Sequence, residues 1–250
     1  MPNPTVFITG ATSGIGRATA VLLGNTGFRI IAAGRRTERL EELKVLLPEG
    51  NLHTLEFDVR DKVAVKNAIE NLPETWKEID VLINNAGNAH GLSDIQNGNV
   101  DDWDMMIDIN VKGLLYVSRE IIPGMITRGG GRIINIGSIA GKEVYPNGNV
   151  YCASKFAVDA LSKAMRLDLL KDNIMVSEIN PGMVETEFSE VRFKGDKEKA
   201  AQTYKGLEPL RAEDIADIIQ FVLTRPKHVN LADILVLPSA QASTTLSIRK

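Results

Sequence analysis

The sequence predicts an α/β fold: a three-layer, doubly wound parallel sheet of about seven strands with helices on both faces. Short apolar runs that fit buried strands alternate along the chain with longer segments whose apolar residues recur at helical spacing. Strands joined through a helix run parallel, because parallel pairs need a crossover connection. Right-handed crossovers then place helices on both faces. In such a sheet, ligand-binding residues are expected just after the carboxyl ends of the strands.

A strand at residues 5–9, a glycine-rich turn and a helix that ends near residue 24 open the chain. Gly10 permits a sharp turn because it has no Cβ, Gly14 lets backbone approach a ligand, and Gly16 lets the helix approach the strand. The free N–H groups and the positive dipole end of the helix then favour an anion above the turn.

The spacing of these glycines, Gly-x-x-x-Gly-x-Gly, leaves two interpretations open by itself: a phosphate-binding loop or a purely structural turn. Thr12 and Ser13 in the turn add hydroxyl donors that suit a phosphate.

The remaining elements follow in order, with proline and glycine as stops. The expected strands are residues 28–34, 52–57, 79–83, 132–136, 175–179 and 234–237. The expected helices are residues 38–47, 62–72, 101–122, 150–170 and 212–223. The polar segment 183–206 is expected to be a mobile flap, and residues 1–250 to form one dinucleotide-binding catalytic domain.

Composition narrows the classes of function. The chain has 250 residues, a net charge of −3 and no basic run, which argues against a nucleic-acid partner. Its one cysteine, Cys152, excludes an internal disulfide and indicates a packing residue in a reducing compartment. The scattered histidines predict no metal site. Without a signal-peptide pattern or an apolar run of about 18 residues, we expect a cytoplasmic protein and no membrane partner.

Two arginines follow the second strand. A cofactor with free ribose hydroxyls would favour an acid at this strand end, but the sequence has Gly34, Arg35 and Arg36. Guanidinium groups match a phosphate fork, so this pair favours the 2′-phosphate of NADP. The alternative is a solvated pair that opens a charged helix.

Further candidates follow strands three and four. Asp58 suits the adenine amino group and Val59 the adenine ring, although an Asp that caps the next turn is the alternative. Asn85 can tie neighbouring strand ends together, while Ala86 and Gly87 let a ribose lie close; a simple turn is again the alternative.

The last group of candidate residues has side chains that suit a proton transfer. Tyr151 and Lys155 lie four residues apart, so on a helix they share one face. A phenol has a reference pKa of about 10, and a nearby ammonium favours the phenolate. Tyr151 can then exchange a proton with a substrate hydroxyl or carbonyl, whose oxygen Ser138 would hold. Asn110 could anchor a water next to Lys155, although each residue alone also has a structural explanation.

These motifs, in this order, resemble the classical short-chain dehydrogenase/reductase family over essentially the whole chain. The matching segments are residues 9–16, 84–87, 151–155 and 181–182, with Asn110 and Ser138. The resemblance implies a Rossmann-type fold, a homotetramer, and a catalytic tetrad of Asn110, Ser138, Tyr151 and Lys155, with Ser138 and Tyr151 also binding substrate. The residues expected to bind the cofactor are Gly10, Thr12, Ser13, Gly14, Ile15, Arg35, Arg36, Asp58, Val59, Asn85, Ala86, Gly87, Tyr151, Lys155, Pro181, Gly182 and Thr186.

Three further segments, residues 33–40, 187–196 and 228–230, are similar to the NADP-dependent 3-hydroxy acid dehydrogenases, also called serine or L-allo-threonine dehydrogenases. The expected reaction is hydride transfer between NADP(H) and a small 3-hydroxy acid, and malonic semialdehyde is the type of oxo substrate. The turn after Pro181 departs from that group, because it is shorter and carries Glu185. A substrate carboxylate needs a cation, for which Arg192 and Lys194 in the flap are candidates, although both could be solvated.

The alternatives within the family are a 3-oxoacyl thioester reductase and a sugar or polyol reductase. The alternative from another class is a non-catalytic NADP-binding sensor, against which the presence of Tyr151 and Lys155 argues.

Overall fold

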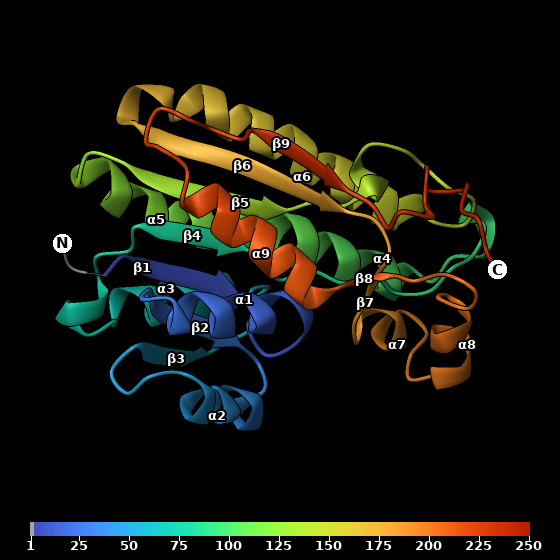
Figure 1. The fold of residues 1–250 in the computed structure, drawn as a ribbon, viewed down its shortest axis with the longest axis horizontal. Helices are drawn as coiled ribbons and strands as arrows, with labels where there is room; N and C mark the ends of the chain where they lie inside the picture. The colour runs from blue at the N-terminus through green and yellow to red at the C-terminus, as the bar shows by residue number, and fades with distance from the viewer. Residues whose placement is uncertain (1–2) are drawn as a thin grey trace.

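In a computed structural model that describes residues 3–250, the chain forms the predicted parallel sheet, seven strands in the order β3-β2-β1-β4-β5-β6-β9 (Figure 1). The strands are β1 (Thr5–Thr9), β2 (Arg29–Gly34), β3 (Leu52–Glu56), β4 (Val81–Asn84), β5 (Gly131–Ile136), β6 (Ile174–Pro181) and β9 (Asp233–Val236). The strand order reverses between β1 and β4, which both pair along their length in parallel register. A ligand crevice is expected at this reversal.

Helices cover both faces of the sheet (Figure 1). One core lies under α1 (Gly14–Asn25), α2 (Thr37–Leu46) and α9 (Ala212–Leu223), and it includes Ile8, Leu23 and Ile219. The other core, with Phe7, Val117 and Val158, lies under α3 (Lys62–Glu70), α5 (Leu114–Thr127) and α6 (Asn149–Asp168). The bounds of β1 are those expected, and the bounds of the other strands differ from the expected ones by at most two residues. The short helical turns are η1 (Glu74–Trp76), η2 (Ile95–Asn97), η4 (Ile139–Gly141) and η5 (Leu170–Asp172).

The long helix expected at residues 101–122 differs from the prediction in two ways. It consists of α4 (Val100–Ile107), a π-helical segment η3 (Asp108–Gly113) and α5, which continues through Pro123 to Thr127. Proline removes one helical hydrogen bond, but Met125 beyond it is fully buried, and its burial favours continuation of the helix.

The segment expected as a flap forms a folded cap. We call residues 183–211 the cap. It contains β7 (Val184–Glu185), α7 (Phe188–Arg192), α8 (Lys197–Gln202) and β8 (Leu210–Arg211), and β7 pairs with β8. Figure 1 shows the cap beyond the carboxyl ends of the central strands. Within residues 3–250, no helix is both long and apolar enough to cross a bilayer.

Candidate active site

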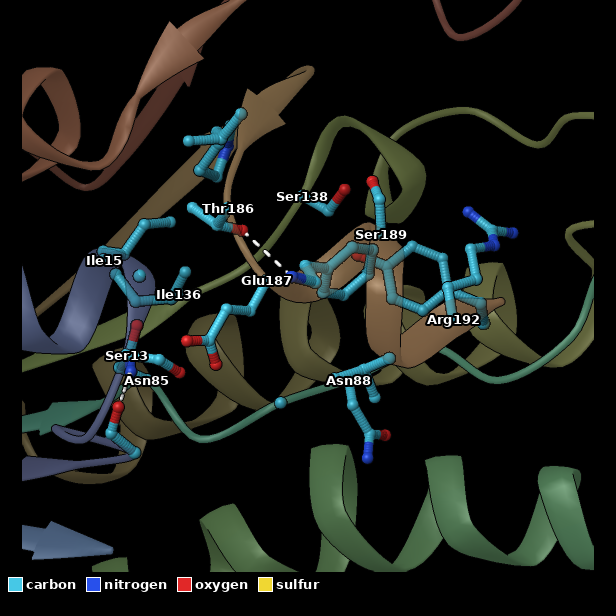
Figure 2. A pocket seen from close by; sticks show the side chains of 18 of the residues that line it. Ser13, Ile15, Asn85, Asn88, Ile136, Ser138, Thr186, Glu187, Ser189 and Arg192 are labelled. Carbon is cyan, nitrogen blue, oxygen red and sulfur yellow. Dashed lines mark hydrogen bonds between the residues drawn. The ribbon is translucent and has the colours of Figure 1, made fainter. Parts of the chain in front are cut away.

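A cleft of about 580 Å³ lies at the carboxyl ends of the strands, between the sheet and the cap (Figure 2). Every residue that the sequence nominates for the cofactor lines it, together with Ser138. Asn110 lies just behind the lining, next to Gly87: a Cβ added at Gly87 would come 3.3 Å from Asn110 Oδ1 and 3.5 Å from Lys155 Nζ. The predicted site residues therefore converge on one end of the sheet.

The glycine turn has the conformation that the sequence analysis requires. Gly10 and Gly14 adopt positive φ angles of 66° and 50°, a region that other residues rarely enter. A Cβ on Gly16 would collide with the carbonyl of Gly10, so close packing of helix on strand needs this glycine. Ser13, the N-cap of α1, makes no side-chain capping bond. The first-turn N–H groups of α1 are thus left for an anion in the cleft.

Asparagine side chains hold the strand ends together, as predicted. Asn85 Nδ2 donates to the carbonyls of Thr9 (2.9 Å) and Gly10 (3.2 Å), which ties β4 to β1. Asn84 Nδ2 donates to Asn135 Oδ1 (2.9 Å) and so links β4 to β5. These bonds fix the floor of the cleft where the strand order reverses.

The arginines after β2 lie at the outer end of the cleft. Arg35 is 60% exposed and lies 3.6 Å from the carboxylate of Asp58. Asp58 accepts hydrogen bonds from the backbone and the side chain of Arg60. Although burial opposes it, these bonds and charges hold the pKa of Asp58 below its usual value. The structure therefore contains the turn-capping arrangement for Asp58, and contact with an adenine stays a prediction.

Arg36 makes a contact that sequence reasoning missed. Its Nη1 lies 2.8 Å from Glu187 Oε2 on the cap, and its Nε and Nη2 reach Thr12 Oγ1 at 3.4 and 3.3 Å. Glu187 also lies 3.5 Å from Arg39. Figure 2 shows Glu187 extending from the cap toward Ser13 and Asn85. The sequence separation of 151 residues between Arg36 and Glu187 gives no local signal for this bridge.

The inner end of the cleft holds the groups with proton chemistry. Tyr151 and Lys155 project from α6, and Ser138 precedes η4; all three are at most 8% exposed. Burial raises the pKa of Tyr151, a change that a hydrogen bond to Ser138 and the charge of Arg192 oppose. Burial also lowers the pKa of Lys155 to about 8, against the charge of Glu178. Lys155 Nζ donates to the carbonyl of Ile136 at 2.9 Å.

Asn110 sits in the π-helical segment η3, whose wider turn directs its side chain inward. Its Oδ1 accepts from the backbone N–H of Asn88 (2.8 Å), and its Nδ2 donates to the carbonyl of Asn88 (2.8 Å) and to Ser154 Oγ (2.9 Å). These bonds join the loop after β4 to α6 behind Lys155.

Arg192, but not Lys194, reaches the cleft from the cap. The Arg192 guanidinium carbon lies 5.5 Å from the ring centre of Tyr151, and its Nη2 donates to Tyr145 Oη at 2.7 Å. Lys194 pairs with Asp102 at 2.9 Å and is absent from the lining. Figure 2 shows Arg192 beside Ser189, at the end of the cleft away from Ser13.

Further residues near the cleft can be compared with the expectations from the sequence. Sequence reasoning missed Tyr145 and Gln241, which line the cleft and carry no motif signal, and it did not assign a role to Phe188, which lines the cleft within the segment 187–196. Glu185, which the turn after β6 introduces, is exposed on β7 and is not part of the lining. Cys152 is buried and packs among apolar residues, as predicted.

The comparisons with known proteins agree with this geometry. The family model described as short chain dehydrogenase matches residues 4–197. An NADP-dependent 3-hydroxy acid dehydrogenase of Salmonella typhi is 46% identical over 246 residues, 98% of this chain and 99% of that protein. The enzyme of that description from Schizosaccharomyces pombe is 43% identical over 254 residues, 100% of this chain and 98% of the relative.

Solved structures give the same result. The closed form of a serine dehydrogenase complexed with NADP+ superposes with a TM-score of 0.94 at 43% identity, covering 98% of this chain and 99% of that chain. Serine dehydrogenase from Escherichia coli superposes with a TM-score of 0.84 at 38% identity, covering 95% of this chain and 99% of the other. Both the broad and the narrow resemblance of the sequence are confirmed, and this chain belongs to the short-chain dehydrogenase family.

Proposed function

We propose that the protein is an NADP-dependent oxidoreductase that transfers a hydride between the cofactor and the hydroxyl or carbonyl carbon of a small 3-hydroxy acid. The observation that carries this substrate class is the position of Arg192, a guanidinium beside the phenol of Tyr151 across the cleft. A 3-hydroxy acid has a carboxylate two carbons from the reacting hydroxyl, so one short molecule can contact both groups. The names of the relatives at 43–46% identity support the same class.

The residues present fit NADP. The positive φ angles at Gly10 and Gly14, the uncapped start of α1 and the exposed guanidinium of Arg35 favour a diphosphate and a further phosphate. Thr186, whose side chain lies 3.3 Å from the Cβ position of Gly14, would contact the bound cofactor, as would Pro181 and Gly182, which also line the cleft. When bound, NADP supplies the hydride donor or acceptor of the reaction.

The chain supplies the proton chemistry. During oxidation, the Tyr151 phenolate takes the proton of the substrate hydroxyl, and during reduction the phenol returns it. Ser138 donates a hydrogen bond that orients the substrate oxygen. Lys155, whose ammonium lies next to Gly87, stabilises the phenolate, and Asn110 supports a path for the proton toward solvent.

A homotetramer in the cytoplasm completes the proposal. Large apolar side chains are exposed on α5 and α6, where Leu115 and Phe156 lie, and on α9 and β9, where Phe221 and Leu235 lie. A tetramer of dihedral symmetry has two kinds of subunit interface, and the apolar surfaces on α5 and α6 and on α9 and β9 could form one each. Light scattering after size exclusion tests the assembly; a mass of one 27.3 kDa chain would contradict it.

A substrate panel tests the function. We would assay the purified protein with NADP and NAD against serine, L-allo-threonine, 3-hydroxyisobutyrate, 3-hydroxypropionate and xylitol, and with NADPH against a 3-oxoacyl thioester. The proposal expects the highest kcat/KM with a 3-hydroxy acid and NADP. Preference for xylitol or the thioester would assign one of the other reductase classes. NADPH binding without turnover of any compound would indicate a sensor.

A further inference from the structure

A cluster of charged side chains around the fully buried Glu178 lies outside the cleft. Lys142 Nζ lies 2.5 Å from Asp159 Oδ1, 3.3 Å from Glu178 Oε2 and 2.7 Å from Asp233 Oδ2. Lys163 pairs with the second oxygen of Asp159 at 2.6 Å. The ammonium of Lys142 thus occupies the place among the three carboxylates that a metal ion would otherwise take.

The cluster continues the row of side chains that begins in the cleft. Tyr151, Lys155, Asp159 and Lys163 follow one another at intervals of four residues and so share one face of α6. The row starts at the buried phenol and ends at the half-exposed ammonium of Lys163. The residue between the cluster and the reacting groups is therefore Lys155.

Glu178 is the member that lies next to Gly137, a residue of the cleft lining. It is 0% exposed, and within residues 3–250 its Oε1 has no hydrogen-bond partner. A Cβ on Gly137 would lie 2.6 Å from this oxygen, and the carbonyl of the preceding Ile136 accepts the bond from Lys155 Nζ. A buried oxygen without a hydrogen-bond partner is unfavourable, so its retention next to Gly137, one residue from the carbonyl that binds Lys155, needs an explanation.

The cluster also holds the backbone of Ser138. Asn180 Oδ1 accepts from the Ser138 N–H at 3.0 Å, and Asn180 Nδ2 donates to Asp233 Oδ1 at 2.8 Å. The same group of charges therefore reaches two of the residues at the inner end of the cleft.

We propose that Glu178 is a positioning residue of the active site: its carboxylate, anchored by Lys142, keeps the buried Lys155 as an ammonium. When its three carboxylates are ionised against Lys142 and Lys163, the cluster carries one net negative charge. That charge offsets the desolvation of Lys155, whose pKa burial lowers and Glu178 raises. Burial and the neighbouring Asp159 raise the pKa of Glu178 itself, and the charge and hydrogen bond of Lys142 oppose this change.

A test of this proposal must separate the titration of Lys155 from that of the charged groups around it. The titratable or charged groups around this part of the molecule are Tyr151, Asp159 and Lys163 on α6, Lys142 after η4, Glu178 on β6, Asp233 on β9, and Tyr145 and Arg192 on the substrate side. A direct titration of Lys155 is therefore more informative than activity alone.

The experiment follows the Lys155 side chain by NMR in lysine-labelled protein, with Lys155→Arg to assign the signal. We expect Glu178→Gln to lower the pKa of Lys155 by about one unit, the scale of a nearby charge. Glu178→Asp keeps the charge and is expected to retain most of the original value. Glu143→Gln is the matched control, because Glu143 is an exposed neighbour of Lys142 that binds Thr244.

A Lys155 pKa in Glu178→Gln no lower than in Glu143→Gln would overturn the proposal. The consequence for the reaction rests on the proposed function: the alkaline limit of substrate oxidation moves down in Glu178→Gln in parallel with the pKa. The NMR titration needs no substrate. If Glu178→Gln lowers the pKa of Lys155 as expected but the protein has no activity, that result would count against the proposed function and not against the role of Glu178. If Glu178→Gln does not fold, Asp233→Asn, which removes another carboxylate of the same cluster, replaces it in the titration and is also expected to lower the pKa of Lys155.

Discussion

The two ends of the cleft are built from different kinds of ionic contact. At the outer end, Arg35, Arg36 and Glu187 are between 38% and 60% exposed, and ion pairs at such sites contribute about 0–1 kcal/mol. At the inner end, Tyr151 and Lys155 are buried, and burial moves the pKa of both. At the outer end, the arginines can therefore replace their carboxylate partners with a phosphate of the cofactor. At the inner end, burial holds Tyr151 and Lys155 in fixed positions.

The inner end should show the largest effect of a substitution. Lys155→Met removes the buried ammonium and keeps the length of the side chain. We expect kcat/KM to fall by at least about a thousandfold, within the range of acid–base contributions, and NADPH to bind about tenfold more weakly through the loss of one charge-assisted bond. Steady-state kinetics and fluorescence titration measure both. Lys171→Met, on the exposed turn η5, is the matched control.

The second-largest effect is expected for Arg192, which reaches the inner end of the cleft from the cap. Arg192→Ala should raise KM for 3-hydroxy acids by about thirtyfold, because a hydrogen bond to a charged group contributes about 2 kcal/mol, with little change in NADPH affinity. Lys194→Ala should leave KM nearly unchanged, because Lys194 pairs with Asp102 outside the cleft. Equal KM values for the two variants would remove the assignment of the carboxylate to Arg192.

Substitutions at the outer end should change the preference for NADP over NAD rather than the rate of the chemical step. Replacing Arg35 and Arg36 together by Ala should raise KM for NADP by about a hundredfold and leave KM for NAD within about threefold, because two guanidinium bonds to a phosphate are lost. Arg119→Ala, an exposed arginine on α5, is the control. A parallel rise in both KM values would show that these arginines do not read the 2′-phosphate.

The smallest effect is expected at the bridge between the cap and the outer end. Glu187→Gln frees Arg36 and removes a carboxylate near the expected phosphate, so NADP affinity should rise, by at most about fivefold for an exposed pair. High salt should diminish the difference, because it screens exposed charges. A loss of affinity would mean instead that Glu187 clamps the cofactor in the cleft.

The same contrast explains what the sequence could predict. Local spacing determined the glycine turn, the pairing of Tyr151 with Lys155 on one helix face, and the strand ends at which Arg35 and Asn85 lie. Contacts between distant segments had no such signal: Glu187 meets Arg36 across 151 residues, and Lys142 meets Asp233 across 91. The π-helical segment at Asn110 and the continuation of α5 through Pro123 depend on tertiary packing, which overrides local preference.

The proposed reaction requires that Tyr151 moves the proton in a cleft whose other groups bind the cofactor. The most direct measurement compares turnover and NADPH binding in Tyr151→Phe, which removes one hydroxyl and keeps the ring against Phe188. We expect turnover to fall by about a thousandfold or more, while the NADPH dissociation constant stays nearly unchanged. Turnover close to that of the wild type would contradict this expectation.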